Sequence, residues 1–361
     1  MGLRSRARWL TAAVASGLRR LRPRRIALVL LVIGCVLATP IVATGVFLRL
    51  EDAGTLPAAA RTRGNDALWL GHAWVDGRKD DADITRLGIL LAGTGIKDLY
   101  VHTGPLENDG TLSAELAPKA RWFVDAVHSR LPGIRVQSWL GDLVEPEFDG
   151  LDTADPVTRD HLTATAAGVL DLGFDGIHFD LEPIRSGSPG FLTLLDQVRA
   201  VTTSRHALLS VSAPVIDPFP GLHSVGLVLF DHGKWWAQAY FAQVARRVDQ
   251  IAVMSYDTAM PTSSLYGGYL AQQTTLALQV TPPGTELLMG LPAFQANDLG
   301  HRAAAETVSA ALRGVRLGLG RTEPGRADFG VALYVDFTAT DQDWSDYRRD
   351  WGQSTFSPAT A

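Results

Sequence analysis

The strongest constraint on the fold is an alternation of short apolar runs with longer amphipathic stretches between residues 68 and 351. Amphipathic stretches of helical length lie between successive apolar runs, and a short helical stretch at Trp344–Trp351 follows the last run. The apolar runs have the composition of buried strands, and they lie at Leu68–Val75, Asp98–His102, Arg135–Leu140, Gly176–Leu181, Leu208–Ala213, Gln250–Tyr256, Glu286–Leu291 and Gly330–Val335. Strands that alternate with helices predict a parallel α/β sheet covered by helices.

The number and spacing of these units favour a closed barrel. Successive expected strands begin roughly 30–45 residues apart, and eight such units predict a (β/α)8 or TIM barrel. The alternative is a doubly wound open sheet, which usually carries a G-x-G-x-x-G turn after an early strand, and the sequence contains no such turn. In a barrel, functional residues gather where the strands end, so we searched those positions for chemistry.

The N-terminal region predicts a membrane anchor. Residues 1–25 contain eight arginines and no acidic residue, and residues 26–48 form a run without a charged side chain. As a helix this run would be roughly 35 Å long, which is enough for a hydrocarbon core of about 30 Å. Arginine-rich flanks stay in the cytoplasm. We therefore expect a single-pass protein of the cell membrane, with a cytoplasmic segment at 1–25, a single transmembrane helix at 26–48 in the lipid bilayer, and the rest of the chain outside the cytoplasm.

Two other forms of export remain open. Cys35, the only cysteine, follows a small residue as in a lipoprotein, and a cleaved signal is the other form; we favour an uncleaved anchor. Residues 49–66 have no hydrophobic period and predict a linker, so that the barrel domain covers residues 67–361. A net charge of -5 provides no positive field for nucleic acid, so we expect no nucleic-acid partner.

The most informative segment for chemistry is Phe174–Pro183, at the fourth expected strand. Because a strand alternates its faces, His178, Asp180 and Glu182 point to one side, and their apolar neighbours point to the other. The apolar residues would pack under the helices, which turns the three ionisable side chains toward the barrel axis. Such a row is costly unless its members are hydrogen-bonded or functional. Pro183 ends the strand and sets Glu182 at the rim.

This segment resembles the D-G-x-D-x-D-x-E signature of glycoside hydrolase family 18, the chitinase-like barrels. Asp175, Gly176, Asp180 and Glu182 match it, and His178 stands at the first acidic position of the D-x-D-x-E core. Three later segments resemble family motifs in the same order, namely Met254-Ser255-Tyr256-Asp257 for M-T-Y-D, Gly290-Leu291-Pro292-Ala293-Phe294 for G-[IL]-P-x-Y, and Gly330-Val331-Ala332-Leu333-Tyr334 for G-V-M-x-W. The resemblance covers the back two-thirds of the barrel, whereas the third expected strand lacks the family's S-x-G-G.

The resemblance implies a specific catalytic scheme. Family enzymes cleave a bond beside N-acetylglucosamine, and the acetamido oxygen of the substrate acts as the nucleophile, which is an exception to the usual pair of carboxylates. By position, Glu182 would protonate the leaving oxygen and later activate water. Asp180 would orient the acetamido N–H, and Tyr256 would hydrogen-bond its carbonyl.

Further residues are expected to contact the sugar. The resemblance places Asp257 at the acetamido subsite and Met254 among the substrate-binding residues, and it makes Tyr334, in place of a tryptophan, the platform on which the sugar stacks. Trp139 is a second candidate platform. His178 is expected to hydrogen-bond Asp180, with a packed core histidine as the alternative. The histidines have no metal-ligand spacing, so we expect neither a metal nor a cofactor.

These observations lead to one main hypothesis and two alternatives. The main hypothesis is a membrane-anchored extracytoplasmic glycoside hydrolase that cleaves an N-acetylglucosamine-containing glycan, peptidoglycan or chitin-like, by substrate-assisted retaining catalysis. Its partner would be a carbohydrate polymer or oligosaccharide. The first alternative is a non-catalytic, lectin-like barrel that binds glycans. The second is a barrel that uses Asp180 and Glu182 on a different sugar.

Overall fold

The structure is a computed structural model, and it describes residues 23–230 and 233–352. The chain divides between Leu50 and Glu51 into two units. The first unit contains most of helix α2 (Pro23–Asp52), a helix of 30 residues with Pro40 in its interior.

Helix α2 covers the run that was expected to be the anchor. Its described apolar side chains are largely exposed, and they include Leu28, Leu31, Val32, Ile41, Val42 and Val46. Within the described part of the chain, the search for a helix both long and apolar enough to span a membrane found none. The expected anchor at 26–48 includes positions outside the residues whose side chains are described, namely 26, 27, 29, 30, 33, 36 and 37, and most of the arginine-rich segment, 1–22, also lies outside the described residues. The anchor stays a prediction.

The second unit is a closed parallel barrel of eight strands in sequence order. The strands are β1 (Asp66–Leu70), β2 (Ile96–Pro105), β3 (Arg135–Leu143), β4 (Gly176–Glu182), β5 (Leu208–Ala213), β6 (Gln250–Val253), β7 (Glu286–Pro292) and β8 (Phe329–Tyr334). Strand β1 pairs with both β2 and β8, which closes the sheet. The (β/α)8 prediction is confirmed, and the open sheet is excluded.

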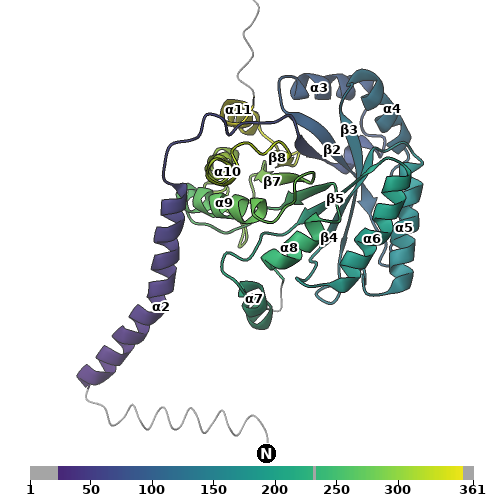
Figure 1. Cartoon of the computed structure of the whole chain (residues 1–361). Helices are drawn as coiled ribbons and strands as arrows, with labels where there is room; N and C mark the ends of the chain where they lie inside the picture. The colour runs from purple at the N-terminus through teal and green to yellow at the C-terminus, as the bar shows by residue number, and fades with distance from the viewer. Residues whose placement is uncertain (1–22, 231–232, 353–361) are drawn as a thin grey trace, which may run out of the picture. The chain divides into compact units, whose positions relative to one another are not determined.

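Helices follow the strands and cover the outside of the barrel (Figure 1). They are α3 (Asp81–Leu91), α4 (Ala120–Arg130), α5 (Pro156–Leu170), α6 (Pro189–Ser204), α7 (Leu222–Phe230), α8 (Gln238–Ala245), α9 (Ser263–Leu278), α10 (Val308–Thr322) and α11 (Asp341–Asp350). Local chemistry fixes several of their starts: Asp155 caps α5 ahead of Pro156, and Ser188 caps α6 ahead of Pro189. Helix α7 was not expected from the sequence.

Two expected boundaries are wrong for physical reasons. The first strand ends at Leu70, and not at Val75, because His72–Trp74 turns into a 3-10 helix. The expected linker at 49–66 is not a free tether: α2 continues through Asp52, and Asp66 already belongs to β1. Between them, the chain packs on α10, where Arg316 donates hydrogen bonds to the carbonyls of Ala60 at 2.9 Å and Pro57 at 3.2 Å.

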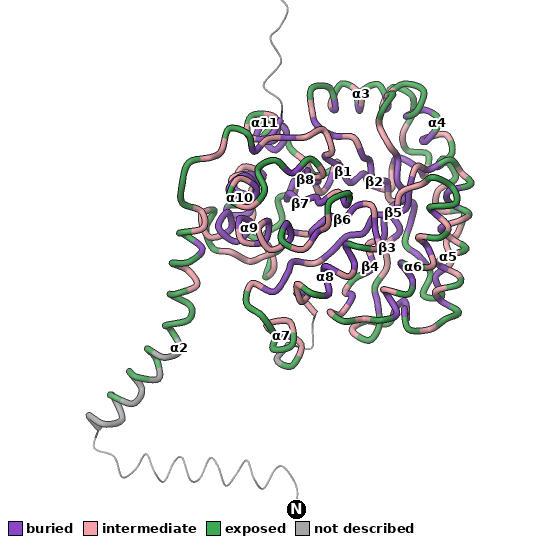
Figure 2. Tube along the Cα trace, viewed as in Figure 1, coloured by how far each residue is buried: buried purple, intermediate pink, exposed green. Residues whose placement is uncertain are grey.

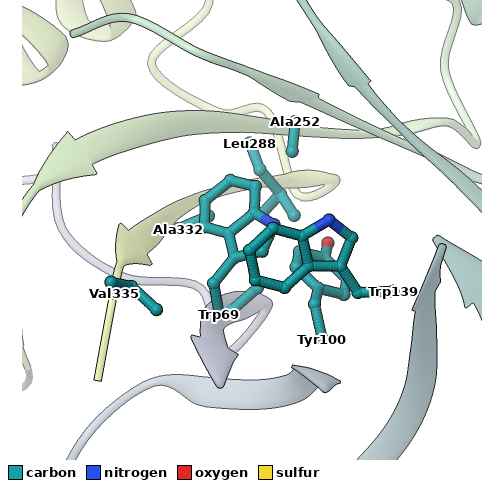
Figure 3. Close-up of a cluster of buried hydrophobic side chains, with 8 residues drawn as sticks. Trp69, Tyr100, Trp139, Ala252, Leu288, Ala332 and Val335 are labelled. Carbon is teal, nitrogen blue, oxygen red and sulfur yellow. The ribbon is translucent and has the colours of Figure 1, made fainter. Parts of the chain in front are cut away.

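The barrel lumen is filled by side chains, which leaves only its mouth open for a ligand. Buried residues run along the strands in Figure 2. Trp69, Tyr100 and Trp139 gather inside the barrel with small partners from β6 and β8, as Figure 3 shows for Ala252 and Ala332. Large rings from one side meet small residues from the other, so the lumen packs without a channel.

Candidate active site

Strand β4 carries the two central carboxyl groups to the mouth of the barrel. Its register on β3 pairs Trp139 with His178, Gly141 with Asp180 and Leu143 with Glu182, so the three ionisable residues of β4 lie at successive depths on one face. Asp180 and Glu182 line a pocket of about 560 Å³ at the carboxyl ends of the strands. Four other predicted site residues line the same pocket, namely Met254, Tyr256, Asp257 and Tyr334.

The carboxyl groups of Asp180 and Glu182 interact directly. The charge of Asp180 acts on Glu182, and the indole N–H of Trp139 donates a hydrogen bond to Asp180 Oδ2 at 2.9 Å. Glu182 is exposed at the mouth, yet the surrounding protein and the neighbouring charge of Asp180 raise its pKa well above the ordinary value. Burial also raises the pKa of Asp180, but its hydrogen bonds favour the anion. Near neutral pH, Glu182 therefore holds the proton and Asp180 the charge.

Two phenols form the wall opposite this pair. The rings of Tyr256 and Tyr334 are stacked with centroids 5.1 Å apart, and Phe294 meets both edge-on. Burial and the nearby charge of Asp180 raise the pKa of Tyr334 to about 12, and burial raises the pKa of Tyr256 well above its ordinary value. Both hydroxyls stay protonated at physiological pH, so each can donate a hydrogen bond into the pocket.

Trp139 and His178 are not among the residues that line this pocket. Only 9% of Trp139 is exposed, and its indole supports Asp180 from below, so the structure does not support its expected role as a sugar platform. His178 is fully buried and stacks flat on Tyr100 with ring centroids 3.8 Å apart. Its position contradicts the expected contact with substrate, because Asp180 lies between it and the mouth.

His178 belongs to a buried hydrogen-bond network inside the lumen. Its Nδ1 lies 2.5 Å from the hydroxyl of Ser210, and its Nε2 lies 3.0 Å from the hydroxyl of Ser212. Trp69 donates its indole N–H to Nε2 at 3.1 Å, so that nitrogen accepts and the ring is neutral. Burial lowers the pKa of His178 to about 3, which agrees with a neutral ring. Ser212 lowers the pKa of Asp180, so His178 influences that carboxylate through a serine.

Sequence patterns did not reveal every residue of the pocket. Lys234 and Ser212 line it as well. The ammonium of Lys234 donates to the carbonyl oxygen of Asp257 at 3.0 Å, and burial lowers its pKa. Lys234 lies in an irregular segment before α8, where no periodicity or motif marks it. Ser212 occupies an inward position of β5, which strand alternation could have identified.

Metal binding was tested against the arrangement of possible ligands. Across residues 23–230 and 233–352, no group of three or more His, Cys, Asp or Glu side chains is arranged to hold a metal ion.

Comparisons with known proteins give a likeness in fold. No protein-family model and no curated protein matches the sequence. Among solved structures, the spore cortex-lytic enzyme SleL of Bacillus megaterium is 11% identical, with a TM-score of 0.56 over 81% of this chain and 75% of that chain. A chitinase from Chromobacterium violaceum is 14% identical, with a TM-score of 0.55 over 79% of this chain and 98% of that one. The Group IV chitinase of Ostrinia furnacalis is 16% identical, with a TM-score of 0.51 over 76% and 93%. At this level of identity, the chain shares the barrel fold of chitinases and of spore cortex-lytic enzymes.

Proposed function

We propose that this protein is a glycoside hydrolase that cleaves the bond beside an N-acetylglucosamine residue in peptidoglycan or a chitin-like glycan. The observation that carries the proposal is the electrostatically coupled pair of Asp180 and Glu182, which lines a pocket of about 560 Å³ together with Tyr256. Structures with the same fold are named as chitinases and spore cortex-lytic enzymes, which supports this substrate class.

In the first step, Glu182 acts as the general acid. Its raised pKa keeps the carboxyl protonated at neutral pH, and its exposed position lets it reach the glycosidic oxygen. The acetamido oxygen of the sugar attacks the anomeric carbon, the bond to the leaving oxygen breaks, and the proton of Glu182 passes to that oxygen. The product of this step is an oxazolinium ring on the sugar and a carboxylate on Glu182.

Asp180 and Tyr256 act on the acetamido group. Asp180 is anionic and is held by Trp139, so it can accept the acetamido N–H and offset the positive charge of the oxazolinium ring. The protonated hydroxyl of Tyr256 donates to the acetamido oxygen and orients it for attack. Glu182 then removes a proton from water, which attacks the anomeric carbon and reopens the ring. Two inversions give retention of configuration.

The test compares N-acetylglucosamine oligomers with glucosamine oligomers of the same length and linkage, using the full-length chain in detergent. Release of shorter oligomers from the acetylated substrate only, detected by mass spectrometry, is the expected result. Cleavage of both substrates would assign the two carboxyl groups to a different sugar chemistry. Binding of the acetylated oligomers without any product after long incubation would assign the barrel to the lectin-like alternative.

We also propose that residues 26–48 anchor the protein in a bilayer with the barrel outside the cytoplasm. The charge-free sequence of this run, the arginines before it and the exposed apolar side chains along α2 support this proposal. A topology reporter fused after Ala361 should be active only outside the cytoplasm. A reporter that is active only inside the cytoplasm would refute the anchor, and labelling of Cys35 by a lipid precursor would replace it with a lipoprotein.

A further inference from the structure

The turn that follows β6 has an uncommon backbone. Asp257 has a φ of 57° and Ala259 a φ of 56°, both in the left-handed region that side chains with a Cβ rarely adopt. Each such residue costs roughly 1–3 kcal/mol, and it persists only where its surroundings hold it. The turn carries Asp257 into the wall of the pocket. Its neighbours must therefore supply the interactions that hold this conformation.

A buried histidine and a buried glutamate supply these interactions. His301, only 1% exposed, places its Nδ1 3.1 Å from Asp257 Oδ1 and 3.5 Å from Glu306 Oε2. The same Glu306 oxygen accepts the backbone N–H of Thr258 at 3.1 Å. The backbone N–H of Ala259 donates to the carbonyl of Gly300 at 2.7 Å. The segment that follows β7 thus holds the turn through its backbone and through two ionisable side chains.

The same histidine also contacts the aromatic wall of the pocket. The rings of His301 and Phe294 lie 4.2 Å apart, and Phe294 packs edge-on against Tyr256 and Tyr334. His301 is therefore packed between the turn that carries Asp257 and the ring that supports both phenols. Movement of His301 would disturb two sides of the proposed subsite at once.

Charged groups surround the His301 ring, although neither of its nitrogens makes a hydrogen bond of standard geometry with the described residues. Asp257 and Glu306 both approach this nitrogen, Asp298 interacts electrostatically with the ring, and Lys234 interacts with both carboxylates. A buried carboxylate is costly unless it is paired, and one oxygen of Glu306 has no hydrogen-bond partner among the described residues. A core position built only for packing would not need two ionisable side chains in contact with this turn.

We propose that His301 and Glu306 are positioning residues, which fix Asp257 in the pocket wall. This inference rests on the proposed function, because it gives Asp257 a task in that reaction. Burial and the charge of Asp180 raise the pKa of Glu182, and the charge of Asp257 adds to this rise. Burial raises the pKa of Asp257 itself, and His301 opposes that rise. In this proposal Glu306 contacts His301, His301 contacts Asp257, and only Asp257 contacts the sugar.

The experiment compares kcat/KM as a function of pH for four variants of the full-length chain. His301→Ala removes the donor, and His301→Asn keeps an amide N–H near the position of Nδ1. Glu306→Gln keeps an acceptor for Thr258 and removes the charge. His128→Ala is the matched control, because it deletes a histidine 2.7 Å from Asp175, at the start of β4 and away from the mouth.

The expected result is a graded loss. His301→Ala should lower kcat/KM by about 10- to 100-fold, since displaced catalytic groups cost rates of this order. Its alkaline limb should move to lower pH, because Glu182 loses its proton more readily when Asp257 is displaced or neutral. His301→Asn should recover most of the wild-type kcat/KM and its pH profile. The kcat/KM of Glu306→Gln should lie between those of His301→Ala and His301→Asn. His128→Ala should match the wild type. Equal losses in His301→Ala and His301→Asn, with an unmoved pH profile, would overturn the proposal and leave His301 as a packing residue.

A second readout separates this inference from the proposed function. Crystal structures of the wild type, His301→Ala and His128→Ala would give the backbone of Asp257 directly. If Asp257 leaves the left-handed region only in His301→Ala, the positioning role is supported. This result would hold even if the wild type cleaves no glycan and the proposed function fails. A turn that is unchanged in His301→Ala contradicts positioning, whatever the activity.

Discussion

Glu182 and Asp180 illustrate how two chemically similar side chains on one strand acquire different protonation states. Glu182 lies nearer the mouth, where the charge of Asp180 and the surrounding protein keep it protonated. Asp180 lies one step deeper and accepts a hydrogen bond from Trp139, and both Trp139 and Ser212 favour its anion. Their environments push the two pKa values apart, which is the arrangement that general acid catalysis needs.

Asp180→Asn should test this division of roles. The amide removes a negative charge beside Glu182, so the pKa of Glu182 should fall and the alkaline limb of the kcat/KM profile should move to lower pH. The rate should also fall by about 10²–10³-fold, since the charge that offsets the oxazolinium ring is gone. Steady-state rates across a pH series would measure both effects. An alkaline limb that stays in place would show that Asp180 does not set the protonation of Glu182.

His178 shows where reasoning from the sequence is limited at the residue scale. Strand alternation correctly turned its side chain to the lumen, but alternation gives only the side of the strand and not the depth. The depth follows from the register with β3 and β5, where Trp139 and Ser210 are its neighbours. At that depth the ring stacks on Tyr100 and is shielded from the pocket.

Because His178 is buried, the stability of the folded chain should depend on pH through this residue. His178→Gln should remove that contribution. The folded pKa of His178 is about 3, whereas the unfolded value is ordinary, about 6.5. As the pH falls from 6.5 toward 3, only the unfolded chain binds the proton, so this group should remove up to about 1.4 kcal/mol of stability per pH unit. Above pH 6.5 the effect is absent. Denaturant unfolding at several pH values should give a shallower slope for His178→Gln; identical slopes would mean that His178 titrates normally when folded.

At the scale of elements, periodicity predicted the strands well and the loops poorly. All eight strands lie where apolar runs predicted them, because a buried parallel strand needs a continuous apolar segment. Loops do not need a continuous apolar segment, so no pattern marks them. The residues that surround Asp257 come from loops. Lys234 precedes α8, and His301 and Glu306 lie between β7 and α10, so only the closed barrel brings them together. Helix α7 also lies in such a connection.

Helices α9 and α10 pack through glycines, which gives a prediction with a matched control. A Cβ on Gly314 of α10 would lie 2.1 Å from the carbonyl oxygen of Gly267 in α9, whereas a Cβ on Gly168 in α5 would meet nothing within 4 Å. Gly314→Ala should therefore destabilise the barrel by about 1–3 kcal/mol. Gly168→Ala should be neutral or stabilising by up to about 1 kcal/mol.

Thermal unfolding of the two variants measures the difference. The Tm of Gly314→Ala should fall and that of Gly168→Ala should hold or rise. Equal Tm values for the two variants would mean that α9 and α10 can separate without cost, and that their close contact does not stabilise the barrel.

At the scale of the whole molecule, barrel closure assembles the pocket from distant parts of the sequence. Asp180 and Glu182 come from β4, whereas Tyr256 follows β6 and Tyr334 ends β8. The motifs predicted these residues because each lies at the end of a strand, and closure brings all such ends to one mouth. The motifs could not predict the supports below the pocket, such as Trp139 under Asp180, because these depend on packing in the lumen.

The central claim is that Glu182 donates the proton that breaks the glycosidic bond, and Glu182→Gln tests it most directly. Glutamine keeps the size and hydrogen-bonding capacity of the side chain but has no acidic proton. We predict that turnover of N-acetylglucosamine oligomers by the full-length chain falls by about 10²–10⁴-fold, while the affinity for the same oligomers changes little. Turnover by Glu182→Gln within a few-fold of the wild-type rate would contradict the account.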